Sequence, residues 1–354
     1  MPGKAETVCR SCGRPDPVVV LSLGTTPLAD RLLTGAQLDE PEPTAPLDLA
    51  LCPECSLVQL TTTVPPECLF NEAYPYYSSV SETLLRHSET NAEALIRSRG
   101  LNEKSLVLEP AGNDGYMLRN FVRRGIPVLG IDPSEGPASA ARAAGVPTLT
   151  AFFTRELAGR LRDEGRMADV VIANNVLAHV PDLNGFVQGI RTVLKKSGIA
   201  VMEVPYVTDL VEKCAFDTIY HQHLCYFSVA ALARLFPRHG LFINRIERLD
   251  IHGGSLRLFM ETVEAPDSTV DNLLKREKEL GVPETAYYLD FARRVGNVQE
   301  ALTHLLTELK GQGKRIAAYG AAAKATTLMS CCGIDGTLID YVVDLNPAKH
   351  GKYM

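Results

Sequence analysis

The stretch Leu106–Gly115, which reads LVLEPAGNDG, decides the fold of this 354-residue chain. An apolar run ends in Glu109 and opens into a loop of small residues, and a helix-like segment, 117–124, follows. A second apolar run then ends in Asp132. Strand, tight loop, helix, strand and acid is the order that opens a nucleotide site in a doubly wound α/β fold. Small residues let backbone N–H groups approach a ligand, and the terminal acid can accept both hydroxyls of a ribose.

The loop itself narrows the choice of ligand. It is not followed by the Gly-Lys-Ser/Thr of a phosphate P-loop, and Ala111 stands where a dinucleotide loop has its first glycine. An adenosine ligand without a pyrophosphate fits better, and S-adenosylmethionine is the commonest of these. The alternative is an ordinary βαβ crossover with acids at its strand ends. The predicted donor site consists of Glu109, Ala111, Gly112, Asn113, Asp114, Gly115, Asp132 and Asn174.

Predicted strands and helices alternate through the middle of the chain. Apolar residues keep helical spacing over Leu183–Leu194. The last two strands are joined through His252–Ser255, HGGS, and we expect them to pair antiparallel. Seven strands with such a pair at the end resemble the Rossmann-like α/β core of class I methyltransferases. The predicted strands cover 105–109, 127–131, 147–150, 168–173, 199–204, 241–248 and 255–263.

Composition limits the function classes. Hydrophobic content is 45%, charged content is 22%, and the formal net charge is −6 without a block rich in Lys or Arg, so a nucleic-acid partner is not expected. No apolar run is long enough to cross a membrane, and the N-terminus, MPGKAETVCR, lacks the apolar centre of a signal peptide. We therefore expect a cytoplasmic protein without a membrane partner, and a monomer.

Four of the nine cysteines form two CxxC pairs, Cys9 with Cys12 and Cys52 with Cys55. Each pair offers two thiolates one tight turn apart, which is the spacing that two corners of a tetrahedral Zn²⁺ site need. Four thiolates saturate the metal, so the predicted zinc is structural. The alternative is two coincidental turns of reduced cysteine.

Two polar clusters are candidate substrate sites. The segment 71–81, NEAYPYYSSVS, offers Tyr74, Tyr76 and Ser78 as a sugar-binding wall, although interface packing explains these residues equally well. After the fifth strand the chain reads Tyr220-His221-Gln222-His223, and Asn175 and His179 follow the fourth strand. Ligands sit at the carboxyl ends of strands in open α/β sheets, so these groups predict a second half of the site.

The last part of the chain predicts a long helix, 284–310, in which Gly296 allows a break. A second strand–loop–helix follows with Gly320 and Lys324, and the next strand ends in Asp344. Backbone donors and a lysine there could hold a phosphate, while a packed βα turn explains the same residues equally well.

Several segments together resemble one family, the sugar C-methyltransferases that act on dTDP-4-keto-deoxyhexoses in antibiotic pathways. The resemblance covers nearly the whole chain, and FDTIYHQH with HGGSLR is its most specific part. It implies a zinc domain at 1–72, an S-adenosylmethionine core at 73–290, a C-terminal α/β lobe at 291–354, a nucleotide-linked ketosugar substrate and methylation at C-3. Similar proteins continue beyond Met354, so we expect the last lobe to be incomplete. The matching segments are CxxC…CxxC, PLAD, YPYYSS, NDG, NNVLAHVPDLNGF, EVPY, FDTIYHQH, HGGSLR, GAAAKAT and DLNPAKHGKY.

Methylation of carbon beside a ketone needs a base, donors for an enolate oxygen and a methyl donor in line. We expect His223, at the position of the family's catalytic histidine, to be the base. Tyr220 and His179 would hold the sugar and its oxyanion. Gln222, where the family has Glu, would orient the sugar or His223. The predicted substrate-binding residues are Tyr74, Tyr76, Ser78, Asn175, His221, Lys324 and Asp344.

Two other classes stay open on the sequence alone. A nicotinamide dehydrogenase would need a better phosphate loop than 111–115 offers. A zinc-stabilised protein that binds the donor without turnover would follow if the missing tail and Gln222, in place of the family's Glu, had abolished catalysis.

Overall fold

The computed structural model describes residues 4–5, 7–69 and 77–354, so Tyr74 and Tyr76 lie outside the described residues. The chain divides into two compact units. Unit 1 combines Met1–Pro66, Tyr206–Ser228 and Arg276–Met354, and unit 2 combines Glu67–Pro205 with Val229–Lys275. These units group segments by packing and not by chain order, so the predicted boundaries at 72 and 290 stay predictions.

Unit 2 contains the predicted seven-stranded sheet, in the order β12-β13-β10-β9-β6-β7-β8. Strands β6 to β10 run parallel, whereas β13 is antiparallel to both β10 and β12, which confirms the expected antiparallel pair. The strands are β6 Val107–Pro110, β7 Val128–Asp132, β8 Thr148–Thr150, β9 Ala168–Asn174, β10 Leu194–Pro205, β12 Phe242–Leu249 and β13 Ser255–Glu261.

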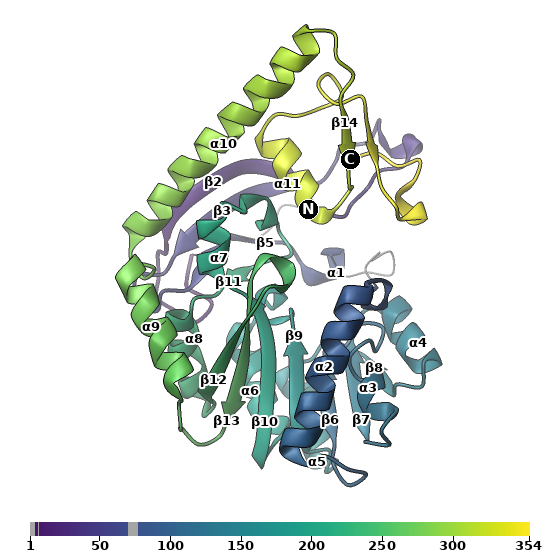
Figure 1. Cartoon of the computed structure of the whole chain (residues 1–354), viewed down its shortest axis with the longest axis vertical. Helices are drawn as coiled ribbons and strands as arrows, with labels where there is room; N and C mark the ends of the chain where they lie inside the picture. The colour runs from purple at the N-terminus through teal and green to yellow at the C-terminus, as the bar shows by residue number, and fades with distance from the viewer. Residues whose placement is uncertain (1–3, 6, 70–76) are drawn as a thin grey trace. The chain divides into compact units, whose positions relative to one another are not determined.

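Helices cover both faces of this sheet, with α2 in front of it and α5 and α6 behind it in Figure 1. Alternate strand residues such as Val170 and Ile172 pack against Leu84 and Leu95 of α2, because strand side chains point to opposite faces in turn. The helix α2 begins after Ser81, whose hydroxyl accepts from the backbone N–H of Leu84 at 3.3 Å. The helices are α2 Glu82–Arg99, α3 Arg119–Val122, α4 Glu135–Ala143, α5 Arg155–Asp163, α6 Leu183–Val193, α8 Val229–Leu235 and α9 Ser268–Leu280.

Unit 1 is built on a four-stranded antiparallel sheet in the order β11-β4-β3-β2. Its core contains Leu47 and Leu49 of this sheet together with Tyr288 and Phe291 of α10. Two short pairs add β1 to β5 and, in parallel, β14 to β15. The elements are β1 Lys4–Ala5, β2 Val18–Pro27, β3 Thr44–Leu51, β4 Val58–Leu60, β5 Thr62–Thr63, β11 Cys225–Tyr226, α7 Val207–Glu212, α10 Thr285–Gly311, β14 Ala317–Tyr319, α11 Ala323–Cys331 and β15 Tyr341–Val343; the short helix α1, Pro66–Leu69, follows β5.

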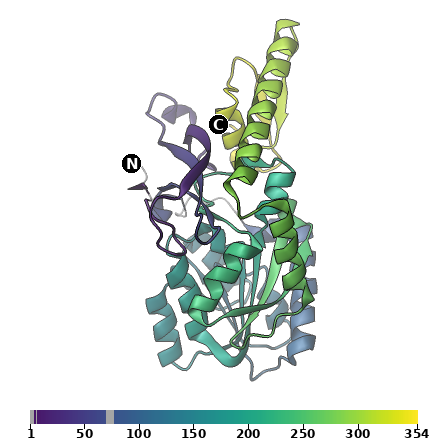
Figure 2. The same cartoon turned by 90° about the vertical axis from the view of Figure 1, so that its left-hand side faces the viewer.

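The long helix α10 does not break at Gly296 as the sequence allowed, but runs on to Gly311 (Figure 2). A single glycine costs a helix only about 1 kcal/mol. Burial of Val295 and Leu306 in the unit 1 core offsets this cost, so packing overrides the local preference.

The segment 206–228 leaves the carboxyl end of β10 and returns to the chain at α8. Within it β11 pairs with β4, and Tyr206 bridges to Phe227 where the segment closes. The loop that carries residues 220–223 therefore belongs to the sheet formed by the first part of the chain, which explains why unit 1 gathers three segments.

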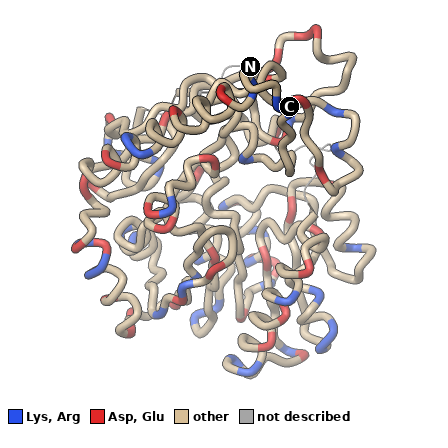
Figure 3. The backbone as a smooth tube through the Cα atoms, turned by 45° about the horizontal axis from the view of Figure 1, so that its top comes forward, with Lys and Arg blue, Asp and Glu red and all other residues tan. Residues whose placement is uncertain are grey.

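Charged residues of both signs are interspersed along the described chain, without a run of one sign (Figure 3). Among the described residues no helix combines the length and the apolar character that a membrane span requires.

Candidate active site and metal centre

The donor loop of unit 2 follows β6 with an unusual backbone. Ala111 and Asn113 adopt left-handed conformations, with φ of 55° and 48°, and Gly115 has a φ of 75°. Alanine in this region costs roughly 1–2 kcal/mol, whereas asparagine and glycine adopt it easily. The turn aims the backbone N–H of Asn113 at Oδ2 of Asp132, 2.9 Å away. The loop is thus fixed to the acid at the end of β7.

Glu109 lies beneath this loop, with 1% of its surface exposed. A Cβ on Gly112 would stand 3.4 Å from its Oε2, so a glycine leaves room for the carboxyl group. Burial raises the pKa of Glu109 well above its usual range, and the nearby charges of Asp132, Asp114 and Glu203 raise it further. Burial also raises the pKa of Asp132.

The predicted donor site contains buried acceptor atoms that lack a partner in the described part of the chain. Oε2 of Glu109 and Oδ1 of Asp114 are two of them. Oδ1 of Asn174 and Oδ1 of Asn175, at the carboxyl end of β9, are two more. Buried acceptors are normally hydrogen-bonded, so these oxygens fit a ligand rich in donors and positive charge. S-adenosylmethionine, with an ammonium group, a sulfonium and ribose hydroxyls, is such a ligand.

Asn113 and Asp114 also hold a neighbouring segment of unit 2. Oδ1 of Asn113 accepts from the backbone N–H of Ser78 at 2.9 Å, and Oδ2 of Asp114 accepts from that of Ser79 at 3.0 Å. The sequence assigned these two side chains to the donor and Ser78 to the substrate. The structure instead places them in contact with one another, and their ligand roles stay predictions.

A buried ionic network at the same sheet edge has no counterpart among the predicted site residues. Glu203 of β10 is 1% exposed and accepts from Nε of Arg257 and from Nε2 of His87, each at 2.9 Å. Burial alone would raise the pKa of Glu203, but the bond from His87 and the charge of Arg257 outweigh it and lower that pKa. The segments EVPY and HGGSLR contain Glu203 and Arg257, but the sequence alone does not show that these two side chains contact each other.

The loop 220–223 of unit 1 presents a histidine in a defined tautomer. Nδ1 of His223 lies 2.9 Å from the carbonyl oxygen of Thr218. A carbonyl only accepts, so we assign the proton to Nδ1, which makes Nε2 the proton-accepting nitrogen. The Tyr220 ring lies 4.1 Å from the imidazole, centroid to centroid, and Tyr226 meets its edge.

The two residues between Tyr220 and His223 are anchored to the first segment of the chain. Nε2 of His221 donates to the carbonyl oxygens of Ala45 and Pro46, at 3.2 and 3.3 Å, and burial lowers the pKa of this imidazole. Gln222 is 4% exposed. Burial raises the pKa of the Asp30 carboxyl group, while the charge of Lys349 and the Gln222 side chain lower it. His221 therefore holds the loop, and direct contact of either side chain with a substrate stays a prediction.

The other predicted site residues are spread over both units. His179 is the last residue of a short 3-10 helix after β9 in unit 2, and its backbone N–H donates to the carbonyl oxygen of Val176 at 2.9 Å. In unit 1, Lys324 lies 3.7 Å from Asp217. The carboxylate of Asp344 accepts from the backbone N–H groups of Ala321 and Asn346, both at 2.8 Å. These bonds order the GAAAK turn in the manner of a packed βα unit.

The four cysteines of the two CxxC pairs gather in unit 1. Their sulfur atoms all lie within 4.8 Å of one another, and Cys9 to Cys55 and Cys12 to Cys52 are each 3.5 Å apart. Tetrahedral Zn–S bonds of about 2.3 Å place sulfurs about 3.8 Å apart, so the cluster fits zinc. The hydrogen bond between Cys9 and Cys55 raises the pKa of Cys9 and lowers that of Cys55, so Cys55 is the first of this pair to become the thiolate that a metal needs.

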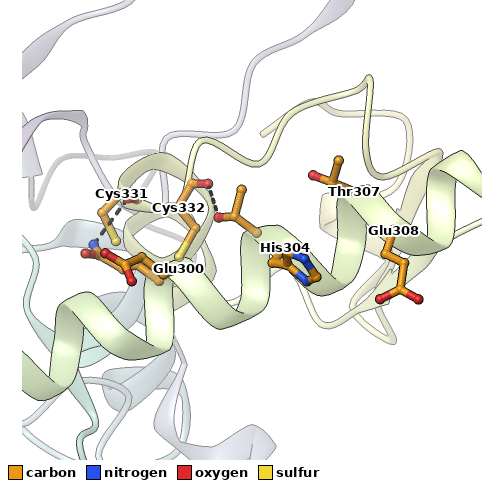
Figure 4. Close-up of a pocket in the computed structure, with 8 residues that line it drawn as sticks. Glu300, His304, Thr307, Glu308, Cys331 and Cys332 are labelled. Carbon is orange, nitrogen blue, oxygen red and sulfur yellow. Dashed lines mark hydrogen bonds between the residues drawn. The ribbon is translucent and has the colours of Figure 1, made fainter.

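A surface groove between α10 and α11 is lined by none of the predicted site residues (Figure 4). Thr303 donates to the carbonyl oxygen of Cys332 at 2.9 Å, and Gln299 donates to that of Cys331 at 3.2 Å. Its polar groups thus serve helix packing. The lining residues are Gln299, Glu300, Thr303, His304, Thr307, Glu308, Cys331 and Cys332.

Family models and a known relative match nearly the whole chain. Models described as "Putative zinc binding domain", "Methyltransferase domain" and "C-methyltransferase C-terminal domain" match residues 9–70, 84–244 and 250–354. The C-methyltransferase NovU of Streptomyces niveus is 33% identical over 349 residues, which cover 98% of this chain and 83% of the relative. The chain belongs to this C-methyltransferase family.

More distant relatives match half of the chain or less. A ubiquinone biosynthesis O-methyltransferase of Rhodopseudomonas palustris strain TIE-1 is 29% identical over 125 residues, which cover 35% of this chain and 48% of that protein. The structure of magnesium protoporphyrin IX methyltransferase from Synechocystis PCC 6803 with bound SAM is 15% identical and covers 50% of this chain and 78% of its own. Its TM-score of 0.39 carries no weight for function.

The family gives the protein its activity and its cofactors. It is an enzyme, an S-adenosylmethionine-dependent C-methyltransferase with a class I Rossmann-like core and a structural zinc site. The expected family, fold class and cofactors are confirmed.

Proposed function

We propose that this C-methyltransferase acts on a nucleotide-linked 4-keto-deoxysugar, at C-3 and through an enolate, in deoxysugar and antibiotic biosynthesis. The observation that carries the proposal is the loop 220–223, in which Nδ1 of His223 lies 2.9 Å from the carbonyl oxygen of Thr218, and from this contact we assign proton acceptance to Nε2. The substrate class and the choice of C-3 rest on the segments FDTIYHQH and HGGSLR of this sequence.

Methylation of carbon requires a carbon nucleophile. A ketone makes the neighbouring C–H acidic, and a neutral imidazole is a suitable base for its proton near pH 7. We assign removal of the C-3 proton to Nε2 of His223. Tyr220, which packs on that imidazole, and His179 are assigned to the sugar and to the oxyanion that develops on the ketone oxygen.

The donor-holding residues are assigned to unit 2. S-adenosylmethionine supplies an electrophilic methyl group when it is bound. We assign its ribose to Asp132, whose carboxylate is oriented by the backbone N–H groups of Asn113 and Ser134. The rest of the S-adenosylmethionine molecule is assigned to Glu109, Asn174 and the backbone of loop 111–115. The buried acceptor oxygens and the left-handed backbone there suit the hydrogen-bond donor groups of this molecule.

The remaining polar residues are assigned to the sugar nucleotide. Asn175 and Ser78 would contact the sugar, and Lys324 would contribute positive charge to the phosphates. His221 and Asp344 spend their described hydrogen bonds on the backbone, so we assign them to ordering the loops that bind the substrate. Tyr74 and Tyr76, outside the described residues, keep their assignment from the sequence alone.

The test separates proton removal from methyl transfer. In D₂O the wild-type protein should wash deuterium into C-3 of a dTDP-4-keto-deoxyhexose, read by mass spectrometry. His223→Ala should reduce both exchange and methylation by at least about 100-fold, the usual effect of losing a general base. His304→Ala, in the groove of α10, is the matched control and should change neither rate.

Near-normal exchange in His223→Ala would end the assignment of the base and pass it to Tyr220 or His179. Zinc content and the melting of unit 1 should be unchanged in His223→Ala, because the cysteines and His223 belong to the same unit. A loss of zinc would show that the variant is misfolded, and His223→Gln would then replace it.

We further infer that the protein acts as a cytoplasmic monomer that does not bind nucleic acid, with segments 1–72, 73–290 and 291–354 as its functional divisions. Four metal-binding thiolates suit a reducing compartment. Light scattering after gel filtration should give the mass of one chain.

A further inference from the structure

The seven-stranded sheet of unit 2 opens at one point of its carboxyl edge. β6 pairs with β7 through Pro110, but it pairs with β9 only through Leu108. The chain also changes direction there, because β7 and β8 extend the sheet on one side of β6, whereas β9 and β10 extend it on the other. Ligands of open α/β sheets bind in the crevice at such a switch point. The ends of β6 and β9 are therefore the two walls of this crevice.

Both walls carry buried acceptor oxygens without a partner among the described residues. Oε2 of Glu109 belongs to the β6 wall, and Oδ1 of Asn174 belongs to the β9 wall. Glu109 follows Val107 at a spacing of two, and Asn174 follows Ile172 in the same way. Val107 and Ile172 pack against α2, so both polar side chains leave the sheet on the face that α2 covers. A ligand that completes these acceptors must bring hydrogen-bond donors to this face.

A histidine of α2, the helix in front of the sheet in Figure 1, is fixed beside the β9 wall. Glu203 of β10 stands opposite Asn174 in the strand register, and its carbonyl oxygen accepts from the backbone N–H of Asn175 at 2.8 Å. Nε2 of His87 lies 2.9 Å from both carboxylate oxygens of Glu203. The His87 side chain is 19% exposed, so the imidazole is held between the helix and the strand end.

The contacts of Glu203 assign the proton of His87. A carboxylate only accepts, so Nε2 carries the proton and Nδ1 keeps a lone pair. The opposite tautomer would let Nε2 accept from Nη2 of Arg257 at 3.2 Å, but it would place a lone pair against two carboxylate oxygens. Arg257 already supplies Glu203 with a cation, 2.8 Å from Nη2 to Oε1, so we assign a neutral imidazole. In the described part of the chain, all hydrogen bonds of this side chain use Nε2.

The free acceptor selects one group of the donor molecule. Beyond the ribose, adenine offers one amino group, whereas the amino-acid end offers an ammonium with three N–H donors and a carboxylate that only accepts. A cluster of unfilled acceptors that includes Glu109 and Asn174 fits the ammonium end. Arg257 does not serve the carboxylate, because its guanidinium is bound to Glu203 and, from Nη1 at 3.1 Å, to Glu247.

We propose that His87 is a further donor-binding residue, which accepts a hydrogen bond at Nδ1 from the ammonium group of S-adenosylmethionine, and that Glu203 is its positioning residue. The buried carboxylate holds the proton on Nε2 and thereby keeps the lone pair on Nδ1. The proposal rests on the donor site assigned above to unit 2. Neither role involves the sugar, so binding measurements decide both.

Two amide side chains separate the two nitrogens of His87. The amide of Gln lies as many bonds from Cβ as Nε2 does, so His87→Gln keeps a donor for Glu203 and loses the acceptor at the place of Nδ1. The amide of Asn lies as many bonds from Cβ as Nδ1 does, so His87→Asn keeps an acceptor there and loses the contact with Glu203. His239→Gln is the matched control, because Nε2 of this other unit 2 histidine lies 2.9 Å from Oδ1 of Asn184.

The first readout compares ligands by titration calorimetry. His87→Gln should weaken binding of S-adenosylmethionine at least about tenfold, the scale of a hydrogen bond to a charged group. Binding of 5′-methylthioadenosine, which lacks the amino-acid portion, should stay within about twofold of wild type. Decarboxylated S-adenosylmethionine keeps the amine and should weaken as S-adenosylmethionine does. His239→Gln should bind all three ligands like wild type.

The second readout is the order of the variants. His87→Asn leaves Glu203 without its imidazole partner, so urea unfolding should find it less stable than His87→Gln. Affinity for S-adenosylmethionine should follow the reverse order, because only His87→Asn keeps an acceptor at the place of Nδ1. A purely structural role of His87 would give the same order in both measurements and would overturn the proposal.

The remaining outcomes are equally decisive. Undiminished affinity for S-adenosylmethionine in His87→Gln, or an equal loss for 5′-methylthioadenosine, would rule out the contact with the ammonium. A loss confined to ligands with the carboxylate would move the contact to that group and contradict the assigned tautomer. If His87→Gln does not fold, a loss of tenfold or more in His87→Asn overturns the proposal instead.

The assigned donor site is tested separately. If Asp132→Ala binds both S-adenosylmethionine and 5′-methylthioadenosine like wild type, the assignment of the ribose fails. The ratio of the two affinities in His87→Gln still decides the role of His87.

Discussion

The two groups of site residues are built differently. In unit 2, Oε2 of Glu109 and Oδ1 of Asn174 are buried without a partner among the described residues. In unit 1, His221 and His223 each bind a backbone carbonyl oxygen, although Nδ1 of His221 is buried without a partner in the described part of the chain. Unfilled acceptors mark the part of a site that a ligand completes, whereas filled ones mark a part that is already ordered.

The difference matches the two tasks. A donor molecule with many hydrogen-bond donors can complete the acceptors of unit 2 when it binds. A general base must be held in one tautomer and one direction before the substrate arrives, because a small misplacement costs much of the rate. We therefore expect variants in unit 2 to act on donor affinity and variants in unit 1 to act on turnover.

The largest effect should follow loss of the metal. Cys9→Ser with Cys52→Ser removes one thiolate from each pair, and the zinc content should fall from about one per chain to none. Because metal binding supplies folding free energy, unit 1 should melt well below its wild-type temperature. Metal analysis and calorimetric melting measure both, with the exposed Cys68→Ser as control.

This variant also tests the separation of the two units. Affinity for S-adenosylmethionine, measured by titration calorimetry below the melting temperature, should stay within about twofold of wild type, because the donor residues lie in unit 2. A large loss of donor affinity would show that the units do not act separately. Retained zinc would remove the metal site.

The next largest effect concerns the ionic network of unit 2. Arg257→Met leaves Glu203 charged and buried, which typically costs about 3–5 kcal/mol in the free energy of unfolding. Adding Glu203→Gln should recover part of the loss. Urea unfolding measures both, and a single variant as stable as wild type would contradict the network.

The same variant has a pH signature. The pKa of Glu203 is lowered in the folded protein, so its contribution to stability is present above the unfolded pKa and lost as the pH falls through the folded value. Without Arg257 part of that advantage disappears, while the bond from His87 remains. The stability gap between wild type and Arg257→Met should therefore narrow as the pH falls.

The sequence predicted the strands and the cysteine cluster better than it predicted the contacts between side chains. Apolar periodicity located all seven strands of unit 2, because buried parallel strands are continuous apolar runs. The CxxC spacing predicted the cysteine cluster in the same way, since two ligands one turn apart need little tertiary information. The continuity of α10 through Gly296 could not be predicted, because core packing decided it.

The sequence predicted which types of residue form the candidate site, but it did not predict which of these residues contact one another. The letters of NDG indicate a donor loop, but not that Asn113 and Asp114 bind the backbone of Ser78 and Ser79. Likewise, the Glu203 network joins a helix and two strands that are distant in the sequence. Pairings of this kind depend on tertiary contacts, which one sequence does not report.

Asp132→Ala tests whether a variant in unit 2 acts on donor affinity. The carboxylate is expected to hold both ribose hydroxyls, so its loss should weaken donor binding by about 1.5–3 kcal/mol, roughly ten- to a hundredfold. Zinc content should not change, because the four cysteines lie in unit 1. Unaltered donor affinity in calorimetry would overturn the assignment of Asp132.

The smallest predicted effect distinguishes the two roles of the NDG loop. Ser78→Pro removes the N–H that Asn113 accepts, and proline is tolerated there because Ser78 opens a 3-10 helix after an extended residue. Asn113→Gly removes the acceptor from the other side and suits the left-handed backbone. Each change should cost about 0.5–1.5 kcal/mol in the free energy of unfolding. Because both changes remove the same hydrogen bond, the double variant should lose no more free energy of unfolding than either single variant, as measured by urea unfolding.

Donor affinity shows whether the Asn113 side chain has a second role. If that side chain also binds the donor, Asn113→Gly should weaken donor binding and Ser78→Pro should not. Equal donor affinities would show that the side chain only holds the 77–79 segment.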